Sequence, residues 1–277
     1  KVEYIHGGVS RNVVEDIANM ELRPTFLSIV DESALGDAVV RKLNNHKVNT
    51  EYIQSAPNGM GTWLAVFDNN GDLAGSISQR PDLMPLLDVL EKKGDEIFAN
   101  ADSIIIEVDV DKEIVKKVVE LCEKHQRKLY GVVSNMSIAV ERRDFLQKFD
   151  CFICNQLEAG MFFADDFSET APKELAEILA KKLQLAQIPS MVVTMGGAGS
   201  VYADMKGKKG FCPAKKVQVK DTTGAGDAFC AGVSSGLTYG KTLAESVEIG
   251  TRLAASVITS SENVCPRFLP GELGIEA

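Results

Sequence analysis

The stretch "DTTGAGDAF", from Asp221 to Phe229, joins a turn with almost no side-chain bulk to the start of a helical pattern. Small residues continue at helical spacing beyond the turn, and such a stripe suits close packing of a helix on a sheet. The stripe consists of Ala228, Ala231, Gly232 and Ser235. A glycine-rich turn that opens a closely packed helix is typical of α/β proteins that bind phosphate groups.

The turn itself predicts an anion site. Gly224, Ala225 and Gly226 leave backbone N–H groups uncovered at the start of the helix, where the helix dipole is positive. Asp227 follows, and is well placed to cap the helix or to accept a proton from a hydroxyl group held beside the anion site. A base next to an anion site is what phosphoryl transfer needs, whereas a capping Asp on an ordinary helix needs no ligand.

The rest of the chain alternates short apolar, β-branched runs with longer amphipathic runs. This alternation predicts an α/β fold with a mostly parallel sheet and helices on both faces. Ligands bind such sheets at the carboxyl ends of the strands. The expected strands are 25–30, 103–108, 128–133, 151–154 and 190–195, and the expected helices include 11–20, 111–127 and 172–184.

Residues 49–80 break the alternation with the short runs "TEYIQ", "GTWLAVFD" and "LAGSIS" and with a hairpin signal, "DNNGD", at 68–72. They predict a small β-sheet lid inserted into an α/β domain that comprises 1–48 and 81–277. An edge hairpin of the main sheet is the alternative. Apolar residues such as Trp63 and Leu64 are expected to pair with a second subunit, giving a homodimer through the lid, or to close over the substrate.

Composition excludes several classes of protein. The net charge of −9 argues against a nucleic-acid partner, and the longest apolar runs are too short to span a membrane. Six dispersed cysteines in 277 residues do not form a disulfide framework and indicate a reducing compartment, the cytoplasm. Cys151 and Cys154 form a Cys-x-x-Cys pair inside an apolar run, without a second ligand pair, so buried structural cysteines are favoured over a zinc or redox site.

The longer string "DTTGAGDAFCAG" resembles the C-terminal signature of the ribokinase-like, or phosphofructokinase-B, family of carbohydrate kinases. Four other stretches resemble motifs of this family in the expected order, so that the resemblance covers essentially the whole chain. These stretches are "GGVSRN" (7–12), "VDESALGD" (30–37), "NQLE" (155–158) and "TMGGAG" (194–199). The resemblance implies a ribokinase-like three-layer sandwich with a small β-sheet lid, and an ATP-dependent kinase.

The resemblance also implies roles for individual residues. It makes Asp227 the general base and Gly224, Ala225 and Gly226 the anion hole. It assigns Asn155 and Glu158 to Mg²⁺, Thr194, Gly196 and Gly199 to the nucleotide, Gly7, Gly8 and Asn12 to the sugar, and Asp221 with Thr223 to a monovalent cation such as K⁺. These residue types suit the roles, since glycines permit close backbone approach and hard cations prefer oxygen ligands.

Two departures from the family pattern stand out. Only six residues precede Gly7, so the first strand of the family and one sugar-binding carboxylate are expected to be missing from this sequence. The stretch 132–137, "VVSNMS", lacks an Asp-Pro pair that relatives often carry after the preceding strand.

The expected reaction is phosphorylation of a primary hydroxyl of a neutral sugar or nucleoside. "GGVSRN" and "GDLAGSIS" are similar to the pseudouridine kinase branch, which makes pseudouridine the best single guess, with ribose or fructose as alternatives. A non-catalytic sugar or nucleotide sensor on the same fold is a further alternative, against which the intact Asp227 and Glu158 argue. A Rossmann oxidoreductase is disfavoured because no Gly-x-Gly-x-x-Gly follows a first strand.

Overall fold

The structure is a computed structural model that describes residues 4–67 and 73–276. Its main sheet has six strands in the order β10-β9-β8-β7-β6-β5 among the described residues, of which β5 to β8 run parallel and β9 and β10 antiparallel. The strands are β5 (Ser103–Glu107), β6 (Lys128–Val132), β7 (Cys151–Asn155), β8 (Ser190–Thr194), β9 (Ser200–Asp204) and β10 (Lys209–Cys212). The predicted mostly parallel sheet is confirmed.

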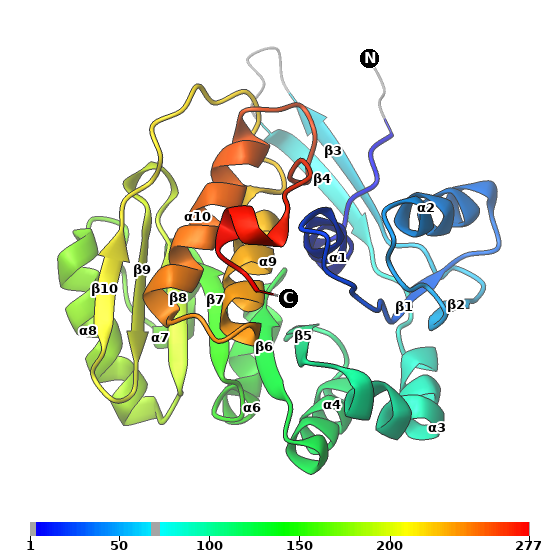
Figure 1. The fold of residues 1–277 in the computed structure, drawn as a ribbon, viewed down its shortest axis with the longest axis horizontal. Helices are drawn as coiled ribbons and strands as arrows, with labels where there is room; N and C mark the ends of the chain where they lie inside the picture. Colours follow the sequence, from blue (N-terminus) through cyan, green and yellow to red (C-terminus); the bar gives the residue numbers. More distant parts are fainter. Residues whose placement is uncertain (1–3, 68–72, 277) are drawn as a thin grey trace.

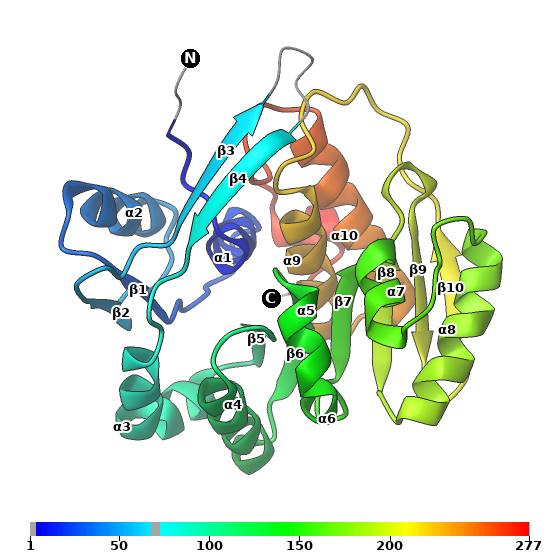
Figure 2. The same cartoon turned by 180° about the vertical axis from the view of Figure 1, so that it is seen from behind.

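Helices cover both faces of this sheet, as predicted (Figures 1 and 2). One face carries α1 (Val9–Asn19), α9 (Ala225–Thr238) and α10 (Leu243–Ile258). The other carries α3 (Pro85–Asn100), α4 (Lys112–His125), α7 (Gln156–Phe163) and α8 (Pro172–Ala186), with the short helices α5 (Met136–Ala139) and α6 (Arg143–Leu146). Among the described residues, no helix is long and apolar enough to cross a membrane.

The strand β7 shows how the alternation of side chains builds two cores. Cys151 and Ile153 belong to the core under α9 and α10, whereas Phe152 and Cys154 belong to the core on the opposite face. All six cysteines of the chain are free, and burial raises the pKa of the Cys151 thiol to about 12. Cys151 and Cys154 are both buried, as predicted, and they lie on opposite faces of the sheet.

Helix α9 is held by close contact with α10 as well as with the sheet. A Cβ atom on Gly232 would lie 2.7 Å from the Cα atom of Gly250, which leaves no room for a side chain. A Cβ on Gly236 would lie 2.6 Å from Oγ of Ser246. The prediction that the small-residue stripe packs on the sheet is therefore wrong for Gly232, which faces α10, and Gly236, outside the predicted stripe, faces α10 as well.

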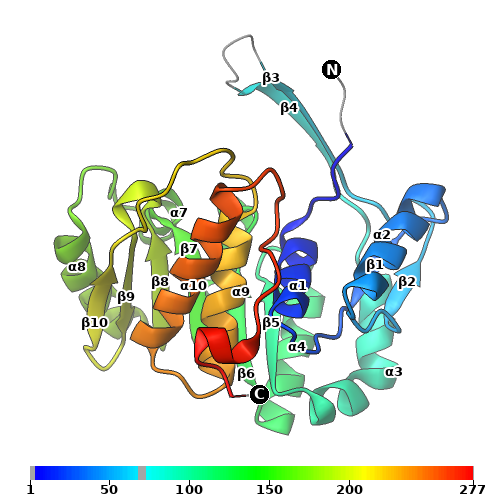
Figure 3. The same ribbon diagram turned by 45° about the horizontal axis from the view of Figure 1, so that its top comes forward.

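Residues 49–80 divide into two parts. Ile53–Ser55 forms β2, which pairs in parallel with β1 (Ser28–Val30) after the helix α2 (Ala34–Asn45). The run "TEYIQ" thus completes a strand–helix–strand unit and is not a lid strand. β3 (Thr62–Phe67) and β4 (Leu73–Gln79) form an antiparallel hairpin that is separate from the other sheets in the described chain. Figure 3 shows the hairpin projecting from the body of the molecule, and the predicted turn 68–72 lies outside the described residues.

Candidate active site

The expected general base lies where α1 meets the first turn of α9. Asn12 on α1 donates from Nδ2 to Oδ2 of Asp227 at 2.6 Å, which joins two segments 215 positions apart. Burial raises the pKa of Asp227 to about 7; the bond from Asn12 and the charge of Arg11 oppose the rise, while the charge of Glu107 adds to it. A carboxylate with this pKa is suited to accept a proton near neutral pH.

The helix start differs from the prediction in one respect. The N-cap of α9 is Gly224, in a left-handed conformation with φ of 81°, and no side chain caps the helix. The alternative in which Asp227 caps the helix is therefore wrong, because Asp227 sits in the first turn and its carboxylate is bonded by Asn12 instead. The carboxylate of Asp227 is therefore bonded to α1 and not to the N–H groups of its own helix.

The anion site is formed by part of the predicted segment. Ala225 donates its N–H to the carbonyl oxygen of Thr222 at 3.2 Å, so this group is already engaged. The N–H groups of Gly224, Gly226 and Asp227 have no acceptor among the described residues. A Cβ on Gly226 would meet nothing within 4 Å, so the space in front of the turn is open. Three free donors at the positive end of a helix are suited to an anion.

The loop before α1 contains two of the proposed sugar contacts, Gly7 and Gly8. Gly8 is the N-cap of α1 with φ of 99°, a conformation that favours glycine. The carbonyl of Gly7 accepts a bond from Nε of Arg11 at 3.1 Å. Gly7 and Gly8 therefore lie directly before α1, on which Asn12 bonds Asp227, and the sugar contacts of the three residues remain a prediction.

Sequence reasoning did not select Glu107, which ends β5 next to this turn. Its Oε1 accepts bonds from the N–H and from Oγ of Ser10, at 2.9 and 2.6 Å. The pair fixes the start of α1 against the carboxyl end of the sheet. The sequence signal for this role is that Glu107 is the one acidic residue in the apolar run "SIIIEV".

Asn155 and Glu158 lie together at the end of β7 in a capping box that begins α7. Oδ1 of Asn155 accepts from the N–H of Glu158 at 2.8 Å, and Oε2 of Glu158 accepts from the N–H of Asn155 at 2.7 Å. Burial raises the pKa of Glu158, and the charge of Asp109 adds to the rise. A carboxylate whose charge is disfavoured in this way would gain from a nearby cation.

The donor set fits Mg²⁺ held mainly through water and phosphate. The described chain contains no group of three acidic, His or Cys side chains that could hold a metal ion by itself. Mg²⁺ usually takes one or two protein carboxylates and otherwise binds water and substrate phosphates. Glu158 supplies such a carboxylate, whereas Oδ1 of Asn155 is already used in the cap.

The predicted nucleotide loop follows β8. Thr194 ends the strand, and Gly196 and Gly199 have φ of 54° and 110°. A Cβ on Gly199 would lie 2.2 Å from the carbonyl oxygen of Cys212, whereas a Cβ on Gly196 would meet nothing within 4 Å. Gly199 is thus required for packing, and Gly196 leaves an open backbone surface that a flat group can approach.

Asp221 and Thr223 form an exposed turn just before α9. Oδ1 of Asp221 accepts from the N–H of Thr223 at 2.8 Å, and this bond lowers the pKa of Asp221. The carboxylate therefore stays ionised and keeps further lone pairs for a cation. The roles in cation binding remain a prediction.

Asp109, a buried carboxylate that sequence reasoning also missed, connects the hairpin to the sheet. Asp109 accepts bonds from the N–H and Oγ of Ser134 at 2.9 and 2.7 Å. Arg80, directly after β4, lies 3.2 Å from Oδ2 of Asp109. The pair holds the base of the hairpin beside Glu107 and Glu158 at the carboxyl ends of the strands.

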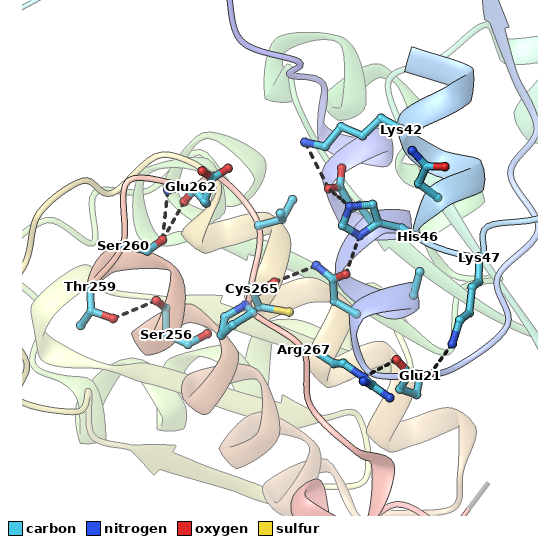
Figure 4. Close-up of a pocket in the computed structure, with 16 residues that line it drawn as sticks. Glu21, Lys42, His46, Lys47, Ser256, Thr259, Ser260, Glu262, Cys265 and Arg267 are labelled. Atoms are coloured by element: carbon cyan, nitrogen blue, oxygen red, sulfur yellow. Dashed lines mark hydrogen bonds and ion pairs between the residues drawn. The ribbon is translucent and has the colours of Figure 1, made fainter. Parts of the chain in front are cut away.

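A cavity of about 660 Å³ lies elsewhere, between α1, α2 and the segment after α10. Figure 4 shows Lys42 and His46 on one wall and Ser260 and Cys265 on the other. None of the predicted site residues lines it, so it is distinct from the region around Asp227.

Known proteins resemble this chain along almost its whole length. The model of the pfkB family of carbohydrate kinases matches residues 1–265. The guanosine-inosine kinase of Exiguobacterium acetylicum is 34% identical over 264 residues, which cover 95% of this chain and 86% of that protein. The pseudouridine kinase of Escherichia coli K12 is 24% identical over 250 residues, which cover 89% and 78%.

Two solved structures share the fold. The ribokinase of Arabidopsis thaliana, complexed with ribose and ATP, has a TM-score of 0.82 and 20% identity, over 94% of this chain and 84% of that chain. The adenosine kinase of Sinorhizobium meliloti has a TM-score of 0.76 and 21% identity, over 93% and 79%. The predicted ribokinase-like fold is confirmed.

Proposed function

This chain belongs to the pfkB family of carbohydrate kinases, and we propose that its acceptor is a purine nucleoside, phosphorylated at the primary hydroxyl of the ribose. The protein is a phosphotransferase that acts on an alcohol group, as kinases of this family are. The observation that carries the proposal is the 34% identity with a guanosine-inosine kinase along almost the whole chain. Pseudouridine, the guess from short sequence patterns, is supported by a relative at only 24% identity.

The charges near the base favour a neutral acceptor. Arg11 is the basic residue whose charge acts on Asp227, and its guanidinium is buried and paired with Glu15. It is therefore not available to a phosphate group on the acceptor. A nucleoside or free sugar fits this site better than a sugar phosphate does.

The geometry supports a direct transfer mechanism. Asp227 accepts the proton of the acceptor hydroxyl, while the free N–H groups of Gly224 and Gly226 stabilise negative charge on the transferred phosphoryl group. Glu158 would hold Mg²⁺ beside the nucleotide phosphates, where the ion neutralises charge that develops in the reaction. Thr194 and Gly196 would contact the nucleotide, and Asp221 with Thr223 would hold K⁺.

A panel of acceptors tests the substrate class. We expect kcat/KM with ATP and Mg²⁺ to be at least about tenfold higher for guanosine or inosine than for pseudouridine or ribose, a difference of about 1.4 kcal/mol. The assay measures ADP release at several acceptor concentrations, with and without K⁺. A preference for pseudouridine or ribose would reject the purine nucleoside but keep the kinase chemistry.

We also propose that the hairpin β3–β4 forms a homodimer interface. Leu64, Val66 and Ile77 share one face of the hairpin according to the strand register, and each is more than half exposed. Trp63, 59% exposed, lies on the other face and is available to cover the acceptor. Since a soluble monomer rarely exposes such a patch, a second copy of the chain is the proposed partner. The six free cysteines support a cytoplasmic location.

Sedimentation equilibrium tests the dimer. We expect the wild-type protein to sediment as a dimer and the double variant Leu64→Ser/Ile77→Ser as a monomer, because the substitution removes the apolar face. Leu185→Ser, which alters a similarly exposed side chain on α8, is the control and should remain dimeric. A wild-type monomer that also fails to become more compact with ATP and acceptor would reject both roles of the hairpin.

A further inference from the structure

We infer that Arg11 is a positioning residue that locks the amide of Asn12, and so decides which oxygen of Asp227 is free to take the proton. The inference rests on the proposed role of Asp227. It assigns a task to a residue that is 6% exposed and therefore has little access to a substrate.

Each of the three guanidinium nitrogens of Arg11 donates at least one hydrogen bond. Nε donates to the carbonyl oxygen of Gly7 at 3.1 Å, and Nη2 donates to that of His6 at 2.8 Å. Nη1 pairs with Glu15, and Nη2 also donates to Oδ1 of Asn12. The guanidinium therefore holds the loop before α1 and also donates to Asn12, which in turn donates to Asp227.

These bonds permit only one orientation of the Asn12 amide. Its Oδ1 accepts from Arg11 and from Nδ2 of Asn263, the latter at 3.3 Å, while its Nδ2 donates to Asp227. A flipped amide would direct its NH₂ group at the guanidinium and its oxygen at the carboxylate, so both contacts would become repulsive. Arg11 thus keeps a donor pointed at Asp227.

The fixed amide gives the two carboxylate oxygens of Asp227 different surroundings. Oδ2 of Asp227 accepts the bond from Asn12 at 2.6 Å. Oδ1 of Asp227 receives no hydrogen bond from the part of the chain that the structure describes, which leaves it for the acceptor hydroxyl. A base held in this way needs no rotation before it takes the proton, and such orientation contributes to catalysis.

Glu15 anchors Arg11 from the side away from the base. Its carboxylate is fully buried, and its Oε1 lies 3.2 Å from Nζ of Lys42 and 3.6 Å from Nε2 of His46. Figure 4 shows Lys42, on α2, and His46, directly after α2, beside the cavity that both side chains line. The network therefore runs from the cavity through Glu15, Arg11 and Asn12 to Asp227.

The charge of Arg11 also acts on the titration of the base. The titratable groups that face Asp227 are Arg11 and Asp16 on α1, the latter with a pKa raised by burial to about 8, and Glu107 at the end of β5. Arg11 lowers the pKa of Asp227, whereas burial and Glu107 raise it. Removal of the positive charge should therefore raise the pKa of the base further, and the acidic limb of the rate should move to higher pH.

The test compares two substitutions that separate charge from geometry. In the wild type we expect kcat/KM to fall below about pH 7, as the base becomes protonated. In Arg11→Met, kcat should fall about 10- to 100-fold and the acidic limb should shift to higher pH. In Arg11→Lys, which keeps the charge but not the planar fork of donors, kcat should fall while the acidic limb moves less.

Arg127→Met is the matched control. Arg127 also donates to two main-chain carbonyl oxygens, those of Phe98 and Ala99, at 2.9 and 2.7 Å, but at the end of α3. We expect it to lower the melting temperature without moving the acidic limb. If Arg11→Met does not fold, Arg11→Lys decides the question, since a kcat equal to that of the wild type would overturn the inference.

A titration without substrate separates this inference from the proposed function. The ¹³C carboxyl signals of labelled aspartates are followed with pH, and Asp227 is identified by the signal missing in Asp227→Asn. A higher titration midpoint in Arg11→Met than in the wild type supports the coupling, whatever the acceptor is. An unchanged midpoint, together with an unchanged acidic limb, would overturn it.

Discussion

Asp227→Asn is expected to lower kcat by about 10²- to 10⁴-fold, the range that a positioned general base contributes. Asparagine has the same shape and can still accept the bond from Asn12, but it cannot take a proton from the acceptor hydroxyl. The affinity for ATP should therefore be unchanged. The measurement is kcat from ADP release, with ATP affinity from calorimetry.

The same substitution should not destabilise the fold, and this separates loss of chemistry from loss of structure. The pKa of Asp227, about 7 in the folded state, lies above its value of about 3.9 in unfolded chains. The folded state thus binds more protons, and the wild type loses stability as the pH rises from about 4 to 7. Since Asp227→Asn lacks this loss, its melting temperature should exceed that of the wild type by more at pH 8 than at pH 5.

Asp204→Asn is the control for this prediction. Asp204 pairs with Ser190 in the strand register and so lies at the opposite end of the sheet from the candidate site. Its Oδ1 accepts from the N–H groups of Lys206 and Lys208, and the amide oxygen of asparagine can do the same. We expect kcat to remain within about twofold of the wild type. An Asp227→Asn enzyme with wild-type kcat would show that the base lies elsewhere.

Gly224→Ala is expected to combine a large loss of activity with a loss of stability. Gly224 has φ of 81°, and an added Cβ would lie 2.0 Å from the carbonyl oxygen of Asn263. The turn must therefore move, and with it the free N–H groups of the anion site. Loss of one such donor typically lowers kcat by about 10²- to 10³-fold. Displacement of Asn263 would also disturb Asn12, since the two amides are bonded.

Gly240→Ala isolates the cost of the backbone conformation. Gly240 has φ of 77°, close to that of Gly224, but a Cβ there would meet nothing within 4 Å. We expect it to cost about 1–2 kcal/mol of stability without affecting kcat. Denaturant unfolding and steady-state kinetics of both variants provide the comparison. Equal effects of the two substitutions would contradict the close packing of the turn on Asn263.

The sequence was sufficient for those features that depend on local patterns. Buried parallel strands appear as continuous apolar runs, so 103–108, 128–133, 151–154 and 190–195 correspond to β5 to β8. The signature around Asp227 identified the helix start and the carboxylate beside it. "TEYIQ" was misassigned because the helix before it, Ala34–Asn45, was read only as part of a family motif and not as the crossover between two parallel strands.

The contacts that tune the site could not be predicted in the same way. Asn263 lies 251 positions from Asn12, and no local pattern marks the pair. The alternative of a cap by Asp227 was wrong because a left-handed Gly224 occupies the cap position and Asn12, on another helix, bonds the carboxylate. Side chains brought together by the fold, such as Arg11 and Glu107 around the base, become visible only when the elements are placed in space.

The central claim is that this chain transfers phosphate from ATP to the primary hydroxyl of a purine nucleoside. The measurement that tests it most directly is the identity of the product formed from guanosine and from inosine, determined by mass spectrometry and ³¹P NMR, with Asp227→Asn in parallel. We predict a nucleoside 5′-monophosphate whose phosphorus couples to the two C5′ protons, formed by the variant at a rate lower by about 10²- to 10⁴-fold. A wild-type enzyme that binds ATP but phosphorylates neither nucleoside, at any pH from 6 to about 9 across the expected titration of the base, would contradict the claim.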